Sequence, residues 1–378
     1  MMLPYTLVVC AIATSALACK PKKSPPLTKE TVALVGGLRA DFDREQFNLT
    51  DGISLLDHET GTYNSYLRLP EAVVFTSTVA YKGRLIVTGG NSVTEAKRGT
   101  TIIEGGETRI GAPQPTTETS KRAGATIGDT LFLCAGLDIP AGDLVHGHDC
   151  HSYSMAEDRW TTLKAKVPEN RDAEGVSVYS MVAIDDRYLY LVFYEERRTQ
   201  RNTPRRETRR ASFFSALQRY VSRERLALAT QPYYLVYRLD TRDADAQWTL
   251  LSETAVKKGD YDISLSSAVL TADGKGILAC GSASLSATKC AIYSLETNTW
   301  SAGPTMPAQP FGVSETRLIR CDGRVFGFRM IPVEPPAEER AKVAVLVDGA
   351  DDWQALQQLS SNNGFDDFSV ACVQMQKK

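Results

Sequence analysis

The apolar residues of this chain fall in short alternating runs, which occur in pairs separated by a tight polar turn. The clearest pairs are TVAYKGRLIVTGG at 78–90, GATIGDTLFLCAG at 124–136 and AVLTADGKGILACG at 268–281. Residues 179–193 and 316–328 have the same arrangement. Turns such as Lys-Gly and Asp-Gly between alternating apolar runs are a strong sign of a β-hairpin. The pattern therefore predicts a chain built from antiparallel hairpins.

A second pattern follows the hairpins and contains all four tryptophans of the chain. Offsets of three and seven residues link a cysteine, a tyrosine and a tryptophan in two copies: Cys150, Tyr153, Trp160 and Cys290, Tyr293, Trp300. Trp353 lies seven residues after Leu346, Tyr63 lies seven residues after Leu56, and Trp248 ends a slightly longer turn. A hairpin and one such copy together make a four-stranded antiparallel sheet of about 50 residues, the size of a propeller blade.

These repeats resemble the kelch repeat, in which a strand ending in Gly-Gly is followed by an aromatic residue and, about seven residues later, a tryptophan. Gly36-Gly37 and Gly89-Gly90 match the glycine doublet, whereas the other copies have Cys-Ala-Gly, Cys-Gly, Val-Phe or Gly-Phe. The copy at 98–115 has no tryptophan. The resemblance spans nearly the whole mature chain. It implies an all-β fold, a kelch-type β-propeller, and six blades fit the spacing.

Ring closure is predicted from the two ends of the repeat region. The segment TVALVGGL at 31–38 corresponds to the second strand of a blade, and DDFSVACVQM at 366–375 resembles a first strand. We therefore expect the C-terminal segment to supply the innermost strand of the first blade, so that no sheet edge stays open.

The N-terminus predicts secretion. An apolar run from Leu3 to Ala18 is short for a membrane span and ends in Ala16-Leu17-Ala18, the small-x-small pattern of a signal-peptidase site. The predicted organisation is a signal peptide at 1–18, a linker at 19–29 and a propeller at 30–378. A membrane anchor, a buried helix and a lipid anchor at Cys19 are the alternatives. In a secreted protein, Asn48-Leu49-Thr50 is a glycosylation acceptor.

Seven cysteines remain after the signal peptide, and in an oxidising compartment thiols pair. The repeat register places the members of two pairs on neighbouring antiparallel strands, so disulfides Cys134–Cys150 and Cys280–Cys290 are predicted. A third disulfide, Cys321–Cys372, would fasten the ring. Cys19 is left over and competes for either thiol of the third pair.

The segment HGHDCH at 146–151 contains three of the four histidines. If Cys150 is in a disulfide, His146, His148 and His151, with Asp149, are the candidate metal ligands. In an extended strand His146 and His148 share a face and His151 points to the other, so the trio needs a turn to converge on one ion. The other interpretation is a polar, solvated hairpin tip, and no cofactor is predicted.

A basic insertion interrupts the repeat at 195–230. It holds ten arginines and four glutamates, a charge of +6, so with a chain total of −2 the remainder carries −8. Its first part is predicted to be extended or disordered, and its second part, with apolar residues at helical spacing from Phe213 to Val221, a short amphipathic helix. The candidate anion-binding residues are Arg197, Arg198, Arg201, Arg205, Arg206, Arg209 and Arg210. A solvated loop and a protease-processing site at Arg206-x-x-Arg209 are the alternatives.

The expected function is binding. We expect a secreted module or scaffold, a monomer, whose partner is a protein or an anionic glycan. The net charge of −2 argues neither for nucleic acid nor for a membrane surface, so no nucleic acid is expected as a partner, and no second apolar segment of membrane-spanning length follows the first. The alternative is a propeller enzyme acting on a sugar, of the isomerase, lyase or oxidase class, because residues from separate blades leave no linear motif. Carboxylates at the channel mouth would favour the enzyme.

Overall fold

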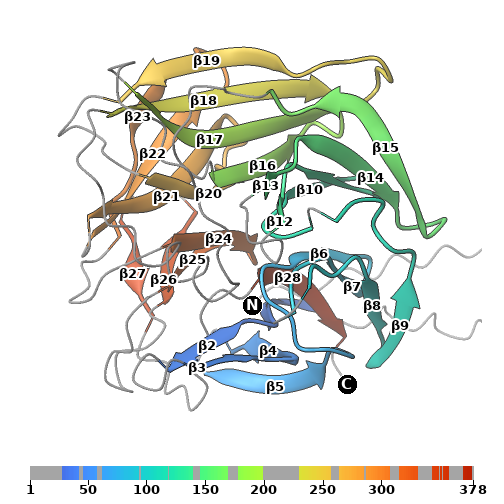
Figure 1. Cartoon of the computed structure of the whole chain (residues 1–378). Helices are drawn as coiled ribbons and strands as arrows, with labels where there is room; N and C mark the ends of the chain where they lie inside the picture. The colour runs from blue at the N-terminus through green and yellow to red at the C-terminus, as the bar shows by residue number, and fades with distance from the viewer. Residues whose placement is uncertain are drawn as a thin grey trace, which may run out of the picture.

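The computed structural model describes 28–41, 46–57, 62–92, 95–117, 119–138, 145–168, 178–198, 230–256, 264–284, 287–306, 315–330, 343–348, 350, 352–356 and 369–376. The predicted signal peptide, Cys19, His58 and the predicted helix of the insertion lie outside these residues. Six four-stranded antiparallel sheets surround a central axis, coloured from blue to red along the chain in Figure 1. The prediction of an all-β, six-bladed propeller is confirmed.

Each blade has an inner, a second, a third and an outer strand, named below from the first blade to the sixth. The inner strands are β28 (Ser369–Gln376), β6 (Ser77–Tyr81), β10 (Ala123–Ile127), β16 (Val178–Ile184), β20 (Ser264–Leu270) and β24 (Glu315–Cys321). The second strands are β1 (Thr28–Val35), β7 (Arg84–Thr88), β11 (Thr130–Cys134), β17 (Tyr188–Arg198), β21 (Gly276–Ser284) and β25 (Arg324–Met330). The third strands are β4 (Gly52–Leu56), β8 (Thr100–Glu104), β14 (Asp149–Ser154), β18 (Thr230–Asp240), β22 (Ala287–Ser294) and β26 (Val343–Val347). The outer strands are β5 (Tyr63–Arg68), β9 (Glu107–Gly111), β15 (Arg159–Lys166), β19 (Thr249–Ala255), β23 (Trp300–Ala302) and β27 (Gln354–Ala355).

The spacing between aromatic residues follows from the outer hairpin of each blade. Tyr153 is the register partner of Trp160 between β14 and β15, and Tyr293 is the partner of Trp300 between β22 and β23. The rings lie 4.8 Å and 5.3 Å apart, in tilted contact. Residues seven apart therefore face one another across a tight turn. The second blade, which has no tryptophan, forms the corresponding hairpin from β8 and β9 with a shorter turn, Gly105-Gly106.

The turn of this hairpin is held by the tyrosine. The Tyr153 hydroxyl donates to Asp158 Oδ1 at 2.5 Å, and the Tyr293 hydroxyl donates to Asn298 Oδ1 at 2.7 Å. Asp158 and Asn298 have φ angles of 51° and 55°, a left-handed conformation that Asp and Asn tolerate better than most residues. The third and fifth blades therefore stabilise this turn by the same tyrosine hydrogen bond, with Asp158 as the acceptor in one and Asn298 in the other.

The glycine doublet follows the second strand of a blade and is explained by a close backbone approach. Gly90 has a φ of 89°, and a Cβ there would lie 2.5 Å from the Val74 carbonyl oxygen. A Cβ on Gly36, with a φ of 61°, would lie 2.5 Å from the Val73 carbonyl oxygen. In the third blade Ala135 occupies the place of Gly36, the first residue of the doublet, with a φ of 58°. The backbone conformation is thus kept where the Gly-Gly sequence is not.

The C-terminal strand closes the ring, as predicted. β28 pairs with β1 over eight residues, from Thr28 opposite Gln376 to Val35 opposite Ser369. In Figure 1 the dark red β28 lies among the blue strands of the first blade. The free inner edge of β1 is thereby covered, which removes an edge that would otherwise invite aggregation.

All three predicted disulfides are present. Cys134–Cys150 and Cys280–Cys290 join the second and third strands of the third and fifth blades, where the cysteines are direct register partners. The third bridge, Cys321–Cys372, joins the inner strand of the sixth blade to the closing strand of the first. The two ends of the propeller are therefore fastened both by a β-ladder and by a covalent bond.

The strand order defines two different faces of the ring. Successive strands of a blade alternate in direction, so the connections between second and third strands and those between blades lie at the end where the inner strands begin. We call this end the loop face. The opposite end, the turn face, carries tight turns such as Lys82-Gly83 and Gly105-Gly106. Two extra hairpins that the pattern did not predict, β2 (Leu38–Asp41) with β3 (Gln46–Leu49) and β12 (Leu137–Asp138) with β13 (Val145–His146), belong to the loop-face connections.

Candidate functional site: the central cavity and the loop face

A cavity of about 480 Å³ lies where the inner strands of the blades meet. Its wall is formed by residues of β6, β10, β16, β20, β24 and β28, so every blade contributes. Its volume is within the range of small-molecule sites in proteins, which is about 300–1,000 Å³. The cavity is therefore the first candidate for a functional site.

One layer of this wall is rich in hydroxyl groups. Equivalent positions near the start of the inner strands are occupied by Ser77, Ala123, Ser180, Ser267, Arg317 and Ser369, which we call the ring position. Four of the six residues are serine and one is arginine. Arg317 lies between Ser267 of the preceding blade and Ser369 of the following strand.

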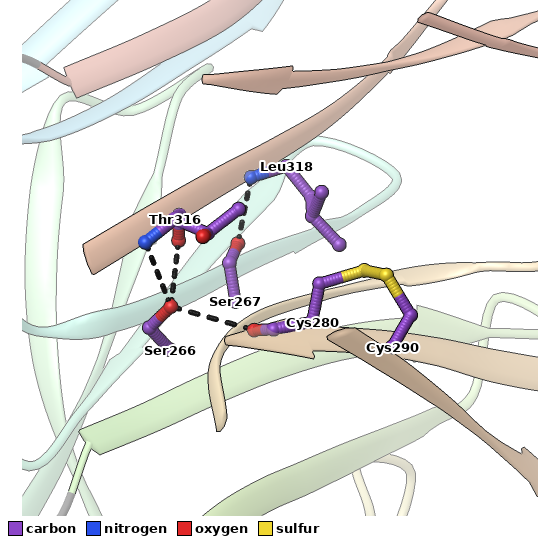
Figure 2. Close-up of a disulfide and its surroundings, with 6 residues drawn as sticks. All are labelled: Ser266, Ser267, Cys280, Cys290, Thr316 and Leu318. Carbon is purple, nitrogen blue, oxygen red and sulfur yellow. Dashed lines mark hydrogen bonds between the residues drawn. A yellow bond between two sulfur atoms is a disulfide. The ribbon is translucent and has the colours of Figure 1, made fainter. Parts of the chain in front are cut away.

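The hydroxyl groups join neighbouring inner strands, and Figure 2 shows one such junction. The Thr316 N–H donates to Ser266 Oγ at 2.9 Å, and the Ser266 hydroxyl donates to the Thr316 carbonyl oxygen at the same distance. The Leu318 N–H donates to Ser267 Oγ at 3.0 Å. An inner strand has a free edge with unpaired N–H and C=O groups, and burying such groups is costly unless they find partners. Short hydroxyl side chains supply these partners without filling the cavity.

The same junction recurs around the ring. The Ala268 N–H donates to Ser180 Oγ at 2.8 Å, which links β16 to β20. Ser369 Oγ is hydrogen-bonded to Thr76 Oγ1 at 2.7 Å and also to Thr78 Oγ1, which links β28 to β6. The serines thus have a structural role that explains their position.

A second layer of the wall is apolar. The residue two positions after the ring position is aliphatic in every blade: Val79, Ala125, Val182, Val269, Ile319 and Ala371. We call these six residues the apolar layer. Since alternate residues of a strand point to the same side, this layer continues the surface of the ring position toward the turn face. The cavity therefore has a polar end at the loop face and an apolar part behind it.

Three arginines line the cavity, and they differ in their surroundings. Arg122 is only 6% exposed, and its guanidinium donates to the carbonyl oxygens of Leu133 at 3.0 Å and Asp149 at 2.8 Å. Arg320 donates to both carboxylate oxygens of Asp348, at 2.6 and 2.8 Å. Arg317 is partly buried at the ring position. Within the described part of the wall there is no aspartate, glutamate, histidine or tyrosine.

The predicted metal ligands lie on the loop face of the third blade. His148 lies between β13 and β14, whereas His151 is 2% exposed and its Nδ1 is 3.1 Å from Thr162 Oγ1. Asp149 pairs with Lys166 at 3.0 Å, and this hydrogen bond lowers the pKa of the Asp149 carboxyl. The side chain of His146 lies outside the described part. A disulfide accounts for Cys150, and other side chains bind the His151 ring and the Asp149 carboxylate. The metal site stays a prediction.

The described residues contain one group of three potential metal ligands, Glu30, Cys321 and Cys372. Both sulfur atoms of this group form the ring-closing disulfide, so neither is a thiolate. Glu30 accepts a hydrogen bond from the Asp322 N–H at 2.8 Å. The group is therefore part of the ring closure.

The basic insertion begins and ends in the sheet of the fourth blade. β17 extends to Arg198 and β18 begins at Thr230, its register partner, so both ends of the insertion lie on the loop face. Arg197 binds Glu253 at 2.8 Å and the buried Glu195 at 3.2 Å, and stacks on the Tyr233 ring at 4.4 Å. The charge of Arg197 is therefore matched within the sheet. The side chain of Arg198, together with Arg201, Arg205, Arg206, Arg209 and Arg210, lies outside the described residues.

Asn48, the predicted glycosylation acceptor, is exposed near the end of β3. Glycosylation itself stays a prediction. No helix in the described ranges is long and apolar enough to cross a membrane.

Sequence reasoning missed the ring position and the apolar layer. A signal was present, because a serine recurs at the start of the inner strands in TSTVAY, YSMVAI, LSSAVL and FSVACV. Each serine alone carries little information, and only the register between blades shows that they share one cavity.

No protein-family model matches the chain, and no curated protein matches it.

Proposed function

We propose that this protein is a secreted, kelch-like β-propeller that binds a protein or an anionic glycan on its loop face. One observation carries this proposal: the strand order brings the two extra hairpins, the HGHDCH segment and both ends of the arginine-rich insertion to the same end of the ring. Propellers commonly bind partners through such clustered loops, because a rigid scaffold positions variable segments.

The charge distribution favours an anionic partner. The insertion carries +6 in a chain whose total is −2, and Arg197, at its edge, is already paired with carboxylates. The arginines at 201–210 supply the charge for binding. Guanidinium groups form bidentate hydrogen bonds with sulfate and carboxylate groups, which suits sulfated or sialylated glycans and acidic proteins.

A further feature supports the proposal. Three disulfides are typical of an oxidising compartment, which agrees with the predicted signal peptide.

The experiment compares two charge-matched variants of the secreted protein on immobilised heparin, a sulfated glycan. In the first, Arg201, Arg205, Arg206 and Arg209 are replaced by glutamine. In the control, four exposed basic residues of the turn face are replaced by glutamine: Lys82, Arg159, Arg242 and Lys275. We expect the first variant to bind at least tenfold more weakly and to lose most of its salt dependence, because these charges are attracted to the glycan through screened Coulomb forces.

The control should bind within twofold of the wild type. Equal loss in both variants would mean that net charge alone acts, and the loop-face proposal would be wrong. Failure of the wild type to bind heparin and an array of sialylated glycans would remove the glycan as a partner.

A further inference from the structure

We infer that the ring-closing disulfide Cys321–Cys372 is a modification site, at which small external thiols exchange with the protein at Cys372 Sγ. Glu30 makes this exchange selective against anionic thiols. The inference does not rest on the proposed loop-face function, because it concerns a different reaction and different residues.

The three disulfides differ in their exposure. Five of the six bridged cysteines are at most 2% exposed: Cys134, Cys150, Cys280, Cys290 and Cys321. Cys372 is partly exposed and belongs to the wall of the central cavity. Exchange requires direct attack of a thiolate on a disulfide sulfur, so its rate depends on access to that sulfur. Cys372 is therefore the bridged cysteine that a small thiol reaches most readily in the folded protein.

Glu30 places a negative charge beside this sulfur. Its Oε2 lies 3.7 Å from Cys372 Sγ, and the two sulfur atoms and a Glu30 carboxylate oxygen all lie within 4.8 Å of one another. The same Oε2 accepts a hydrogen bond from the Asp322 N–H at 2.8 Å, which holds the carboxylate in this position. A thiolate that approaches Cys372 Sγ therefore meets a carboxylate of the same sign.

The basic residues of β24 do not cancel this charge at the sulfur atoms. Arg320 donates to both carboxylate oxygens of Asp348, so its charge is matched. Arg317 lies four residues before Cys321, roughly 13 Å along an extended strand. The Glu30 carboxylate is thus the charge closest to the reacting atoms among these three groups.

The exchange itself is a direct displacement. The incoming thiolate sulfur bonds to Cys372 Sγ, the Sγ–Sγ bond breaks, and its electron pair goes to Cys321 Sγ, which takes up a proton from solvent. The products are a mixed disulfide at Cys372 and a free thiol at Cys321. The sulfur of the external thiol is oxidised and that of Cys321 is reduced, so no other reactant is needed.

Glu30 acts on both ends of this reaction. Its charge repels the thiolate that arrives at Cys372 and disfavours the thiolate that forms at Cys321. A second negative charge on the external thiol increases the repulsion, whereas an ammonium group on the thiol offsets it. The preferred reactant is therefore a small thiol that carries no further negative charge.

The wild-type protein provides the first test. The folded protein is incubated with cysteamine or with 2-mercaptoethanesulfonate, at equal thiolate concentration. These thiols are similar in size, but one carries an ammonium group and the other a sulfonate. Cysteines that become free are alkylated and located by peptide mass spectrometry. We expect cysteamine to open Cys321–Cys372 about tenfold faster than either of the other bridges, and about tenfold faster than 2-mercaptoethanesulfonate opens it.

Two results would overturn the inference. Opening of all three bridges at one rate would show that exchange proceeds through unfolding and not at an accessible Cys372. Equal rates with the two thiols would show that no local charge selects between them. This comparison needs no variant to fold.

The second test assigns the residue through the ratio of the two rates. Glu30→Gln keeps a side-chain oxygen that can accept the Asp322 N–H, and it should bring the rates with the two thiols to within about twofold of each other. Mere loosening of the structure would raise both rates alike and leave their ratio unchanged. Glu296→Gln, which removes an exposed carboxylate from the turn after β22, is the matched control and should keep the wild-type ratio.

An unchanged ratio in Glu30→Gln, or an equal fall in Glu296→Gln, would refute the role of Glu30. The variant without Arg201, Arg205, Arg206 and Arg209 should keep the preference for cysteamine, which separates this inference from the proposed glycan binding.

Discussion

The ring-closing disulfide offers the sharpest test of how this propeller is held together. The bond Cys321–Cys372 joins residues 51 apart in the chain, whereas Cys280–Cys290 joins residues only 10 apart within one blade. Replacing both cysteines of a bridge by serine removes the cross-link from the unfolded as well as the folded chain. The chain-entropy estimate gives about 4 kcal/mol for the longer loop and about 3 kcal/mol for the shorter one.

The assay is urea unfolding followed by tryptophan fluorescence, with the Cys280→Ser/Cys290→Ser protein as matched control. All four tryptophans lie in the third to sixth blades, so the signal reports on the propeller beyond the closing strand. We expect the Cys321→Ser/Cys372→Ser protein to lose about 4 kcal/mol of unfolding free energy. For a chain of 378 residues this corresponds to a decrease of roughly 5 °C in melting temperature.

Hydrogen exchange separates ring closure from general stability. In the Cys321→Ser/Cys372→Ser protein the amides of β28 (Ser369–Gln376) should exchange faster relative to the other inner strands, because closure then depends on the β1–β28 ladder alone. The control should leave this ratio unchanged. If the two variants lose the same stability and exchange β28 equally, the disulfide does not act as the ring fastener and the reasoning fails.

Three further predictions concern the closing strand, the glycine doublet and the turn that contains Asp158. Deleting 369–378, which removes β28, should leave the protein unable to fold to a soluble monomer, as judged by size-exclusion chromatography, whereas deleting only 377–378 should have no effect. Gly90→Ala should lower the unfolding free energy by more than about 3 kcal/mol, beyond the roughly 1–3 kcal/mol that a left-handed backbone alone costs. Gly83→Ala, with a φ of 78° but nothing within 4 Å of its Cβ, should show the backbone cost only, and equal losses would contradict the close-approach explanation. Burial raises the pKa of the Asp158 carboxyl, but hydrogen bonds from Tyr153, the Ala112 N–H and Arg109 outweigh it and hold that pKa below its usual value. The ionised Asp158 carboxylate therefore stabilises the fold above the unfolded pKa of about 3.9, and this stabilisation is lost as the pH falls through the lower folded pKa. Asp158→Asn has no such carboxylate. In urea titrations its unfolding free energy should therefore decrease less than that of the wild type between about pH 7 and pH 3. A larger loss in Asp158→Asn would contradict the sign of the shift.

The sequence by itself determined the strands of the blades, the blade repeat and two of the three disulfides. Alternation of apolar residues, tight polar turns and residues seven apart all report on contacts within one hairpin, where the spacing along the chain fixes the distance in space. Tyr153 and Trp160 are such a pair, and Cys280 and Cys290 are another. For Cys321–Cys372 the blade register predicted the pairing but left Cys19 as a competitor for either thiol, and the structure shows the bond between Cys321 and Cys372.

Only the tertiary structure decided what lines the centre of the ring. Ser77, Ser180, Ser267 and Ser369 follow one another at intervals of 103, 87 and 102 residues in the chain, and only the closed ring places them in one layer with Arg317. The structure also shows that the charge of Arg197 is matched by Glu195 and Glu253. Composition alone gave all arginines of the insertion the same role. The physical reason is the same in both cases: periodicity along a strand reports which side a residue faces, whereas the partner it meets there comes from a neighbouring blade or strand and depends on how the chain closes on itself.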